Sequence, residues 1–212
     1  MTRRGGLPWR GLVLVAFIVG GLAVLRPWTI QPIATATPAA FDAASYVASI
    51  WETRVLPEAE RSAVEIAVAI RDTPSTSAPG GPPSRRSVFV KGTAVVTELD
   101  RRSQVGLARV RLLEGAGPTG AAIQIGPVLR GTGLRDALGF IRFTDFVNQI
   151  EFASVSNALN DRVEKDVLAP LDGEHLAGKR IAFIGVVTLG PSSVDAPLEI
   201  LPLRIEILGD GR

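Results

Sequence analysis

Alternating apolar and polar residues predict five β-strands after position 87. The last strand is the clearest, because Leu201, Leu203, Ile205 and Ile207 occupy every second position and therefore share one face. Such alternation is typical of strands with one buried face. The five predicted strands are Val88–Glu98, Val105–Leu113, Ala121–Ile125, Arg180–Leu189 and Leu198–Leu208.

Apolar residues at helical spacing predict helices ahead of these strands. In the segment Phe41–Arg71, aromatic and branched side chains recur on one helical face. Pro57 is expected to divide the segment into two helices, because proline is tolerated in a first helical turn but not in a helix interior. The second of these helices is predicted to cover Glu58–Arg71.

A further helical segment separates the third predicted strand from the fourth. It begins with a short helix at Gly131–Gly133 and continues with a longer helix from Thr144 or Asp145 to about Leu168. Three strands, a helical insertion and two strands are the element order of an OB-fold, a five-stranded Greek-key barrel. We therefore predict an α+β fold: an OB-like barrel with a helical insertion between strands three and four, and two N-terminal helices. Other small α+β domains share this order, so it does not decide the fold alone.

The first 28 residues have the pattern of a membrane anchor. Gly11–Leu25 is an uncharged run of 15 residues, with three arginines before it and Arg26 after it. A full span needs about 20 residues, but the flanking arginines and tryptophans can reach the two membrane surfaces. Because most of the basic charge precedes the run, the N-terminus is expected to stay in the cytoplasm.

The chain is therefore predicted to have three parts. Residues 1–28 form a single-pass anchor in the cytoplasmic membrane, residues 29–40 a flexible tether, and residues 41–212 one domain in the periplasm or extracellular space. The alternative is a cleaved signal peptide, because Ala34-Thr35-Ala36 has the small-x-small form of a cleavage site.

The amino-acid composition argues against several classes of function. The sequence has no cysteine, and its single histidine, His175, lies in a polar segment, so no catalytic triad, metal site or cofactor is predicted. Four of the 23 basic residues and none of the 21 acidic ones lie within residues 1–30, which leaves 19 basic against 21 acidic residues. The chain after residue 30 therefore has no excess of basic residues, and a domain without such an excess is not expected to bind nucleic acid.

Arginines surround the predicted start of the insertion. Thr132 is placed to cap the short helix, and Arg130 and Arg135 flank it. Free N–H groups and guanidinium groups both favour negative oxygens, so one hypothesis is a site for a carboxylate, a phosphate or a sugar. The other is structural: the arginines pair with acidic residues and fix the insertion to the barrel. The acidic residues available are Asp136, Asp145 and Glu151.

Amide side chains in the longer helix are the second unusual feature. Asparagine is a poor choice inside a helix unless its amide has a partner. Asn157 and Asn160 are three residues apart and are expected to be neighbours on the helix surface. With Asn148 and Gln149, they are candidate ligand-binding residues that would contact sugar hydroxyls. The alternative is that they bind backbone groups of the barrel.

The sequence contains two further candidate sites. OB-folds often bind ligands at the loops joining strands one to two and four to five. Here these loops are Leu99–Gln104 and Gly190–Pro197, which carry Arg101, Arg102 and Asp195 but no aromatic residue. An enzyme would have to use paired carboxylates. The spacing of the acids in the insertion, Asp136, Asp145, Glu151 and Asp161, does not distinguish them from surface acids, so no enzyme is predicted.

Four stretches resemble one bacterial family. FDAASYVASIWETRVLP, VFVKGTAVV, IGPVLRGTGLRDALGFIRFTDFVNQIEFASVSNALNDRV and GKRIAFIGVV together resemble DUF2291, a family of predicted periplasmic lipoproteins, over about residues 41–208. Members are often encoded beside sugar ABC-transporter components. The resemblance implies a non-catalytic accessory protein whose partners are transporter subunits or a solute-binding protein, and it supplies no catalytic residues. The sequence departs from the family in lacking a cysteine for lipid attachment, so the apolar segment would replace it. A self-contained sugar- or anion-binding module is the alternative.

Overall fold

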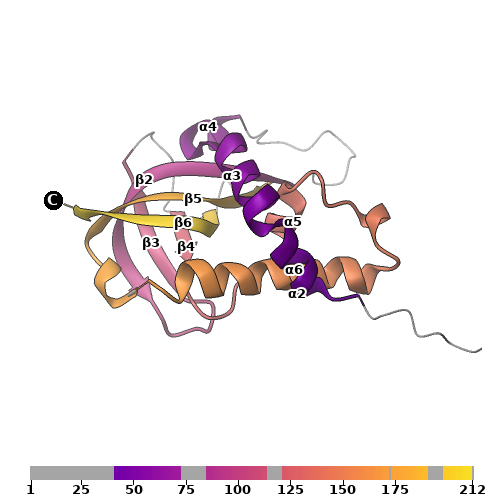
Figure 1. Cartoon of the computed structure of the whole chain (residues 1–212). Coiled ribbons are helices and arrows are strands. Elements are labelled where there is room, and N and C mark those ends of the chain that lie inside the picture. The colour runs from indigo at the N-terminus through magenta and orange to yellow at the C-terminus, as the bar shows by residue number, and fades with distance from the viewer. Residues whose placement is uncertain (1–40, 73–84, 114–120, 172, 191–197, 212) are drawn as a thin grey trace, which may run out of the picture. The chain divides into compact units, whose positions relative to one another are not determined.

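The computed structural model describes residues 41–72, 85–113, 121–171, 173–190 and 198–211 (Figure 1). The predicted anchor and tether lie outside these residues. Within the described ranges, no helix is both long and apolar enough to cross a membrane. The segment Phe41–Arg212 forms one compact unit.

Five strands close into a barrel. The hydrogen-bonded order is β2-β3-β4-β6-β5, and β5 pairs again with β2, which closes the ring. All these pairings are antiparallel except that of β4 with β6. The helical insertion lies between β4 and β5, the third and fourth barrel strands, so the predicted OB-like architecture is confirmed. The strands are β2 (Arg86–Asp100), β3 (Leu107–Leu112), β4 (Ala121–Gln124), β5 (Lys179–Leu189) and β6 (Leu198–Asp210).

The N-terminal helical segment follows a different course from the predicted one. It runs without a break through α2 (Ala43–Ile50), the π-helical turn η1 (Trp51–Val55) and α3 (Leu56–Ser62). Pro57 therefore does not divide it. A proline lacks the N–H that an α-helix needs and collides with the carbonyl four residues earlier. The wider π turn directly before Pro57, in which the Leu56 N–H donates to the carbonyl of Trp51, is consistent with that requirement.

The break comes later, inside the helix predicted for Glu58–Arg71. Ala63 is extended, and the short strand β1 (Val64–Glu65) pairs in parallel with β2 before α4 (Ile66–Arg71) begins. Val64 lies opposite Val90, and Glu65 lies opposite Lys91. Sheet pairing, which helical periodicity does not report, interrupts the predicted helix.

The insertion contains two α-helices and several short turns. Its longest helix, α6, begins at Gln149, later than predicted, because Asn148 caps it. The helix then passes into a second π-helical turn. The elements are α5 (Gly133–Ala137), η2 (Phe143–Asp145), α6 (Gln149–Val163), η3 (Glu164–Leu168) and η4 (Gly173–Leu176).

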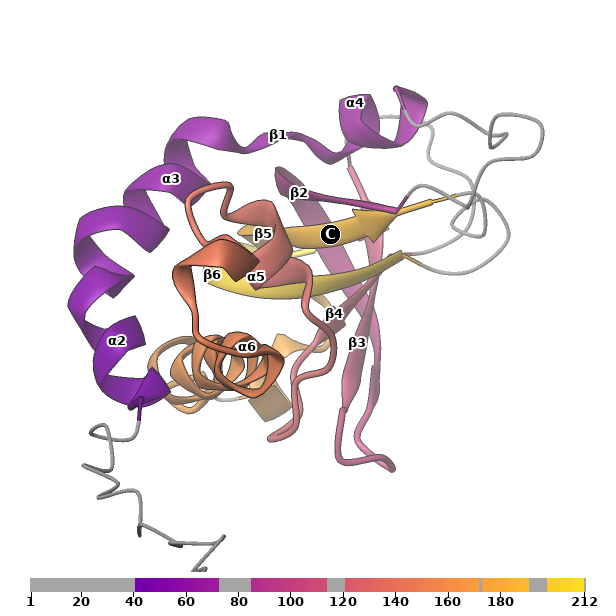
Figure 2. The same cartoon turned by 90° about the vertical axis from the view of Figure 1, so that its right-hand side faces the viewer.

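Helices α2, α3, α5 and α6 form a layer on one side of the barrel, where α2 packs across α6 (Figure 2), whereas α4 packs against β2 and contributes Ile66 and Ala69 to the barrel core. This arrangement gives the domain two apolar cores. One fills the barrel and includes Val90, Ile123 and Phe183. The other lies between the helices and the barrel wall and includes Trp51 and Leu159.

The last strand contributes to both cores. Leu201 and Leu203 face the helical layer, whereas Ile205 packs against the barrel core. The pairing of β5 with β6 shifts between Ile184 and Gly185, whose partners are Arg204 and Pro202. The shift reverses which face of β6 the alternate side chains occupy. The predicted common face of Leu201, Leu203, Ile205 and Ile207 is therefore wrong.

Candidate functional site

The structure places Arg130 in a network at the mouth of the barrel. Its guanidinium lies 3.4 Å from Glu199 at the start of β6. Its backbone N–H donates to the side-chain oxygen of Gln124, which is buried and whose nitrogen donates to Glu199. The network connects the start of the insertion to β4 and β6, and Glu199 is the partner of Arg130 in place of the acidic residues expected from the sequence.

Thr132 and Arg135 interact with one acidic residue. Thr132 stands at the N-cap position of α5, but its hydroxyl donates to Asp136 at 2.6 Å instead of capping the helix. The Arg135 guanidinium also donates to Asp136, at 2.6 Å, and lies 3.9 Å from the centre of the Phe152 ring. Its side chain is only 11% exposed. Arg135 therefore joins α5 to α6.

The amide residues do not form one surface. Asn160 is buried, and its nitrogen donates to the carbonyl of Gly131 at 3.1 Å. Its side-chain oxygen is also buried and has no hydrogen-bond partner in the described part of the chain. Asn157 and Gln149 are exposed instead. Asn148 caps α6 by accepting a hydrogen bond from the Glu151 N–H at 2.9 Å.

These positions lead to the first prediction. Replacing Asn148 with alanine is expected to destabilise the domain by about 1 kcal/mol, because the cap of α6 is lost. Replacing Asn157 with alanine is the matched control, and its effect should stay within about 0.5 kcal/mol. Urea unfolding followed by far-ultraviolet circular dichroism measures both. Equal effects of the two variants would contradict the structural role given to Asn148.

The structure shows a pocket that the sequence did not predict. It has a volume of about 680 Å³ and lies between the helical layer and β6. Both π-helical turns, η1 and η3, border it, and such turns often occur at functional sites. None of the seven candidate ligand-binding residues lines it. The lining residues are Trp51, Glu52, Leu56, Lys165, Asp166, Val167, Pro170, Leu171, Leu203, Arg204 and Ile205.

Charged groups of both signs stand around an apolar floor in this pocket. Trp51 and Leu203 are buried at the floor, whereas Glu52 and Lys165 are exposed. Asp166 accepts a hydrogen bond from Arg162, and the guanidinium of Arg162 lies 5.8 Å from the centre of the Trp51 ring.

Arg204, on the β6 side of the pocket, forms an ion pair of 2.7 Å with Glu60. The pocket therefore offers donors and acceptors above apolar surface, an arrangement suited to recognition. No local sequence pattern predicts this pocket, because residues more than 150 positions apart in the chain line it.

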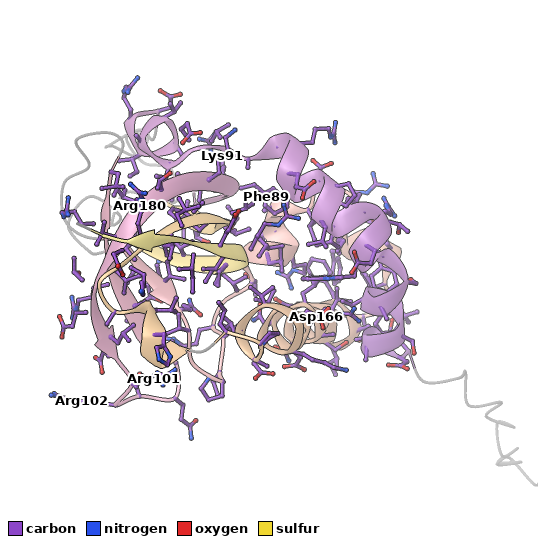
Figure 3. All side chains as sticks on the ribbon, turned by 60° about the vertical axis from the view of Figure 1, so that its left-hand side comes forward. Phe89, Lys91, Arg101, Arg102, Asp166 and Arg180 are labelled. Carbon is purple, nitrogen blue, oxygen red and sulfur yellow. The ribbon has the colours of Figure 1, made fainter. Side chains whose placement is uncertain are left out.

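The loop between β2 and β3 lies away from this pocket. Arg101 and Arg102 are exposed at its tip, whereas Asp166 lies on the helical side of the domain (Figure 3). The other predicted OB loop, Gly190–Pro197, lies outside the described residues except for Gly190. In the described ranges, no group of three or more His, Cys, Asp or Glu side chains is arranged to hold a metal ion.

One solved structure supports the fold. An OB-fold protein from Thermotoga maritima has a TM-score of 0.58 and 20% sequence identity, covering 79% of this chain and 98% of its own. An OBody bound to hen egg-white lysozyme has a TM-score of 0.28 and 18% identity, covering 58% of this chain and 81% of its own. At these identities the likeness to the first structure shows the fold alone. No curated protein matches the sequence significantly.

The family resemblance seen in the sequence is confirmed. The model of DUF2291, described as a predicted periplasmic lipoprotein, matches residues 13–206. The match spans the barrel, the helical layer and the pocket. It supports an extracytoplasmic location, although the sequence contains no cysteine to carry a lipid. The chain belongs to the DUF2291 family of predicted periplasmic lipoproteins.

Proposed function

We propose that the protein is a non-catalytic accessory protein of a sugar ABC transport system. It is anchored in the cytoplasmic membrane through Gly11–Leu25, with its N-terminus in the cytoplasm and its domain outside. The extracytoplasmic family description supports the location. The arginines on both sides of the apolar run support the anchor and its orientation.

The observation that carries the proposal is the pocket between η1, η3 and β6. Its apolar floor and charged surroundings match the buried centre and polar rim of a protein-binding surface. Lys165 and Glu52 are exposed there, and a partner with complementary charges could pair with them. Binding energy at such surfaces is concentrated in a few residues, so single changes in the pocket should be informative.

Contacts of the acids in the insertion support a binding role over a catalytic one. Asp136 is held by Arg135 and Thr132, and Asp145 accepts a hydrogen bond from the Arg142 N–H. Glu151 accepts one from the Val147 N–H. Each of these three carboxylates therefore has a local structural partner.

Affinity purification of the full-length chain from detergent-solubilised membranes, with mass spectrometry of its partners, tests the proposal. The wild type should recover transporter subunits or a solute-binding protein. Lys165→Glu should reduce this recovery about tenfold, equivalent to about 1.4 kcal/mol of binding free energy. Arg102→Glu, in the distant β2–β3 loop, is the matched control and should leave recovery unchanged.

Two outcomes would contradict the proposal. One is recovery of the chain alone, and the other is equal partner recovery by Lys165→Glu and Arg102→Glu. Sugar uptake in a strain without the gene gives an independent measure. Normal uptake of every sugar tested would argue against a transport role.

The pocket also favours a second candidate function, a self-contained module that binds a sugar or an organic anion. Its volume lies within the range of about 300–1,000 Å³ that is common for small-molecule sites. Lys165 and Arg204 would bind anionic or hydroxyl oxygens, but Trp51, which is only 1% exposed, offers no ring face for sugar stacking. Calorimetric titration with monosaccharides, polyols and organic acids tests this function. Absence of binding by all three classes would remove it.

A further inference from the structure

Three large apolar side chains are exposed where the chain enters α6. Phe143 is 53% exposed, Val147 89% and Ile150 81%. The other exposed large apolar side chains in the described residues are at most 45% exposed. We call these three residues the apolar tip. Exposed apolar surface of this kind often marks a site of contact with a protein or a membrane.

The apolar tip rests on a cluster of aromatic rings. The ring of Phe143 lies edge-on to Phe152, with 5.6 Å between centres, and Phe152 lies 5.6 Å from Phe146. Phe146 in turn packs against Phe41 and Tyr46, at 5.4 and 5.7 Å. This packing holds the Phe143 ring in place, so that side chain loses little conformational freedom on contact with another surface.

The aromatic cluster also places the tip beside the point where the chain enters the domain. Phe41, the first described residue, contacts Phe146, and the starts of α2 and α6 lie on the same side of the domain in both views (Figures 1 and 2). Residues 26–40 connect the apolar segment Gly11–Leu25 to Phe41. Fifteen residues span at most about 54 Å in any conformation, so Phe41, beside the tip, stays within about this distance of the end of the anchor.

Charges around the tip are compatible with a membrane surface. The carboxylates of Asp145 and Glu151 accept hydrogen bonds from the backbone N–H groups of Arg142 and Val147. The Arg142 guanidinium lies 3.9 Å from the Asp145 carboxylate, and the Arg142 side chain is 73% exposed next to Phe143. An arginine beside an aromatic residue suits the headgroup region, because the guanidinium can reach phosphates while the ring enters the apolar layer.

We propose that the apolar tip inserts into the outer surface of the lipid bilayer that holds the N-terminal anchor. This inference rests on the anchor in the proposed function. It fixes the orientation of the domain, with the starts of α2 and α6 facing the membrane. The turn η3 lies at the other end of α6, about 22 Å along the helix axis. The pocket that η3 borders is then held away from the lipid.

The absence of cysteine from the sequence allows a direct test. A single cysteine introduced as Val147→Cys is labelled with a polarity-sensitive fluorophore, and the full-length chain is reconstituted into vesicles of phosphatidylethanolamine and phosphatidylglycerol. Leu208→Cys is the matched control, because Leu208 is an exposed apolar residue near the end of β6, on the opposite side of the domain from the start of α2 (Figure 1).

We expect the probe at position 147 to emit at shorter wavelength than the probe at position 208. It should also be quenched by lipids that carry a quencher near the headgroup. Adding Ile150→Asp to the Val147→Cys chain should reverse both effects, because a charged residue opposes insertion of the tip. Equal emission and quenching at the two positions would overturn the proposal.

Alkaline extraction of the same vesicles measures the anchor separately. If the chain resists extraction but the probe at position 147 stays in water, the tip proposal fails and the anchor stands. If the chain is extracted, the anchor fails, and the tip proposal, which depends on it, fails too.

Discussion

Replacing Gly126 with alanine should destabilise the domain by about 3 kcal/mol or more. A Cβ atom at this position would lie 2.3 Å from the carbonyl oxygens of Gln104 and Val105. The three nearest atoms all belong to backbone, so rotation of a side chain cannot relieve these contacts. The close approach is also part of the fold, because the Gly126 N–H donates to the carbonyl of Val105 at 2.7 Å.

Gly139→Ala is the matched control for this prediction. No atom lies within 4 Å of the position that a Cβ would take there, and the residue does not adopt a positive φ. The change should leave stability unaltered or raise it by about 0.4–1 kcal/mol, since alanine restricts the unfolded chain. Urea unfolding by circular dichroism compares the two variants. Similar midpoints would show that the loop between β2 and β3 can move away from β4 at little cost.

Leu159→Ala should destabilise the domain by about 2–5 kcal/mol, the range for a large-to-small change in a packed core. Leu159 is fully buried in the helical core, with Trp51 and Leu134 in the same cluster. The loss has two causes: apolar surface is no longer buried, and the cavity that remains cannot close completely. The effect should appear as a lower urea midpoint with an unchanged slope.

Ile150→Ala is the control on the same helix. It removes the same number of carbon atoms from a side chain that is 81% exposed, so stability should change by no more than about 0.5 kcal/mol. A cost below about 1 kcal/mol for Leu159→Ala would mean that the helical layer contributes little to the folding of the domain.

The barrel could be predicted because its strands alternate regularly. Predicted and observed strand limits differ by at most two residues, since turns and charged residues bound the apolar alternation. The prediction for Leu201–Ile207 failed because an irregular pairing with β5 reverses the alternation, and the partner strand is not visible in a local pattern. The prediction for Pro57 failed because a π turn, which leaves no mark in apolar periodicity, precedes it.

The candidate site was harder to predict than the fold. Arginine and asparagine residues at the start of the insertion stand out in the sequence, yet Arg135 and Asn160 mainly connect structural elements. Residue type identifies a polar group that needs a partner, but it does not say whether that partner is a ligand or a backbone carbonyl. The pocket is lined by residues such as Trp51, Asp166 and Arg204, which are far apart in the sequence and which only the folded chain brings together.

The pairing of β6 has a consequence for the order of events during export. This strand supplies the parallel partner of β4 and the antiparallel partner of β5, so the barrel cannot close before Leu198–Asp210 is present. Helix α2 leaves the ribosome early, but its packing partner α6 is made about a hundred residues later. Folding of the domain must therefore wait until nearly the whole chain is available, and apolar surfaces of the early strands remain unpaired until then.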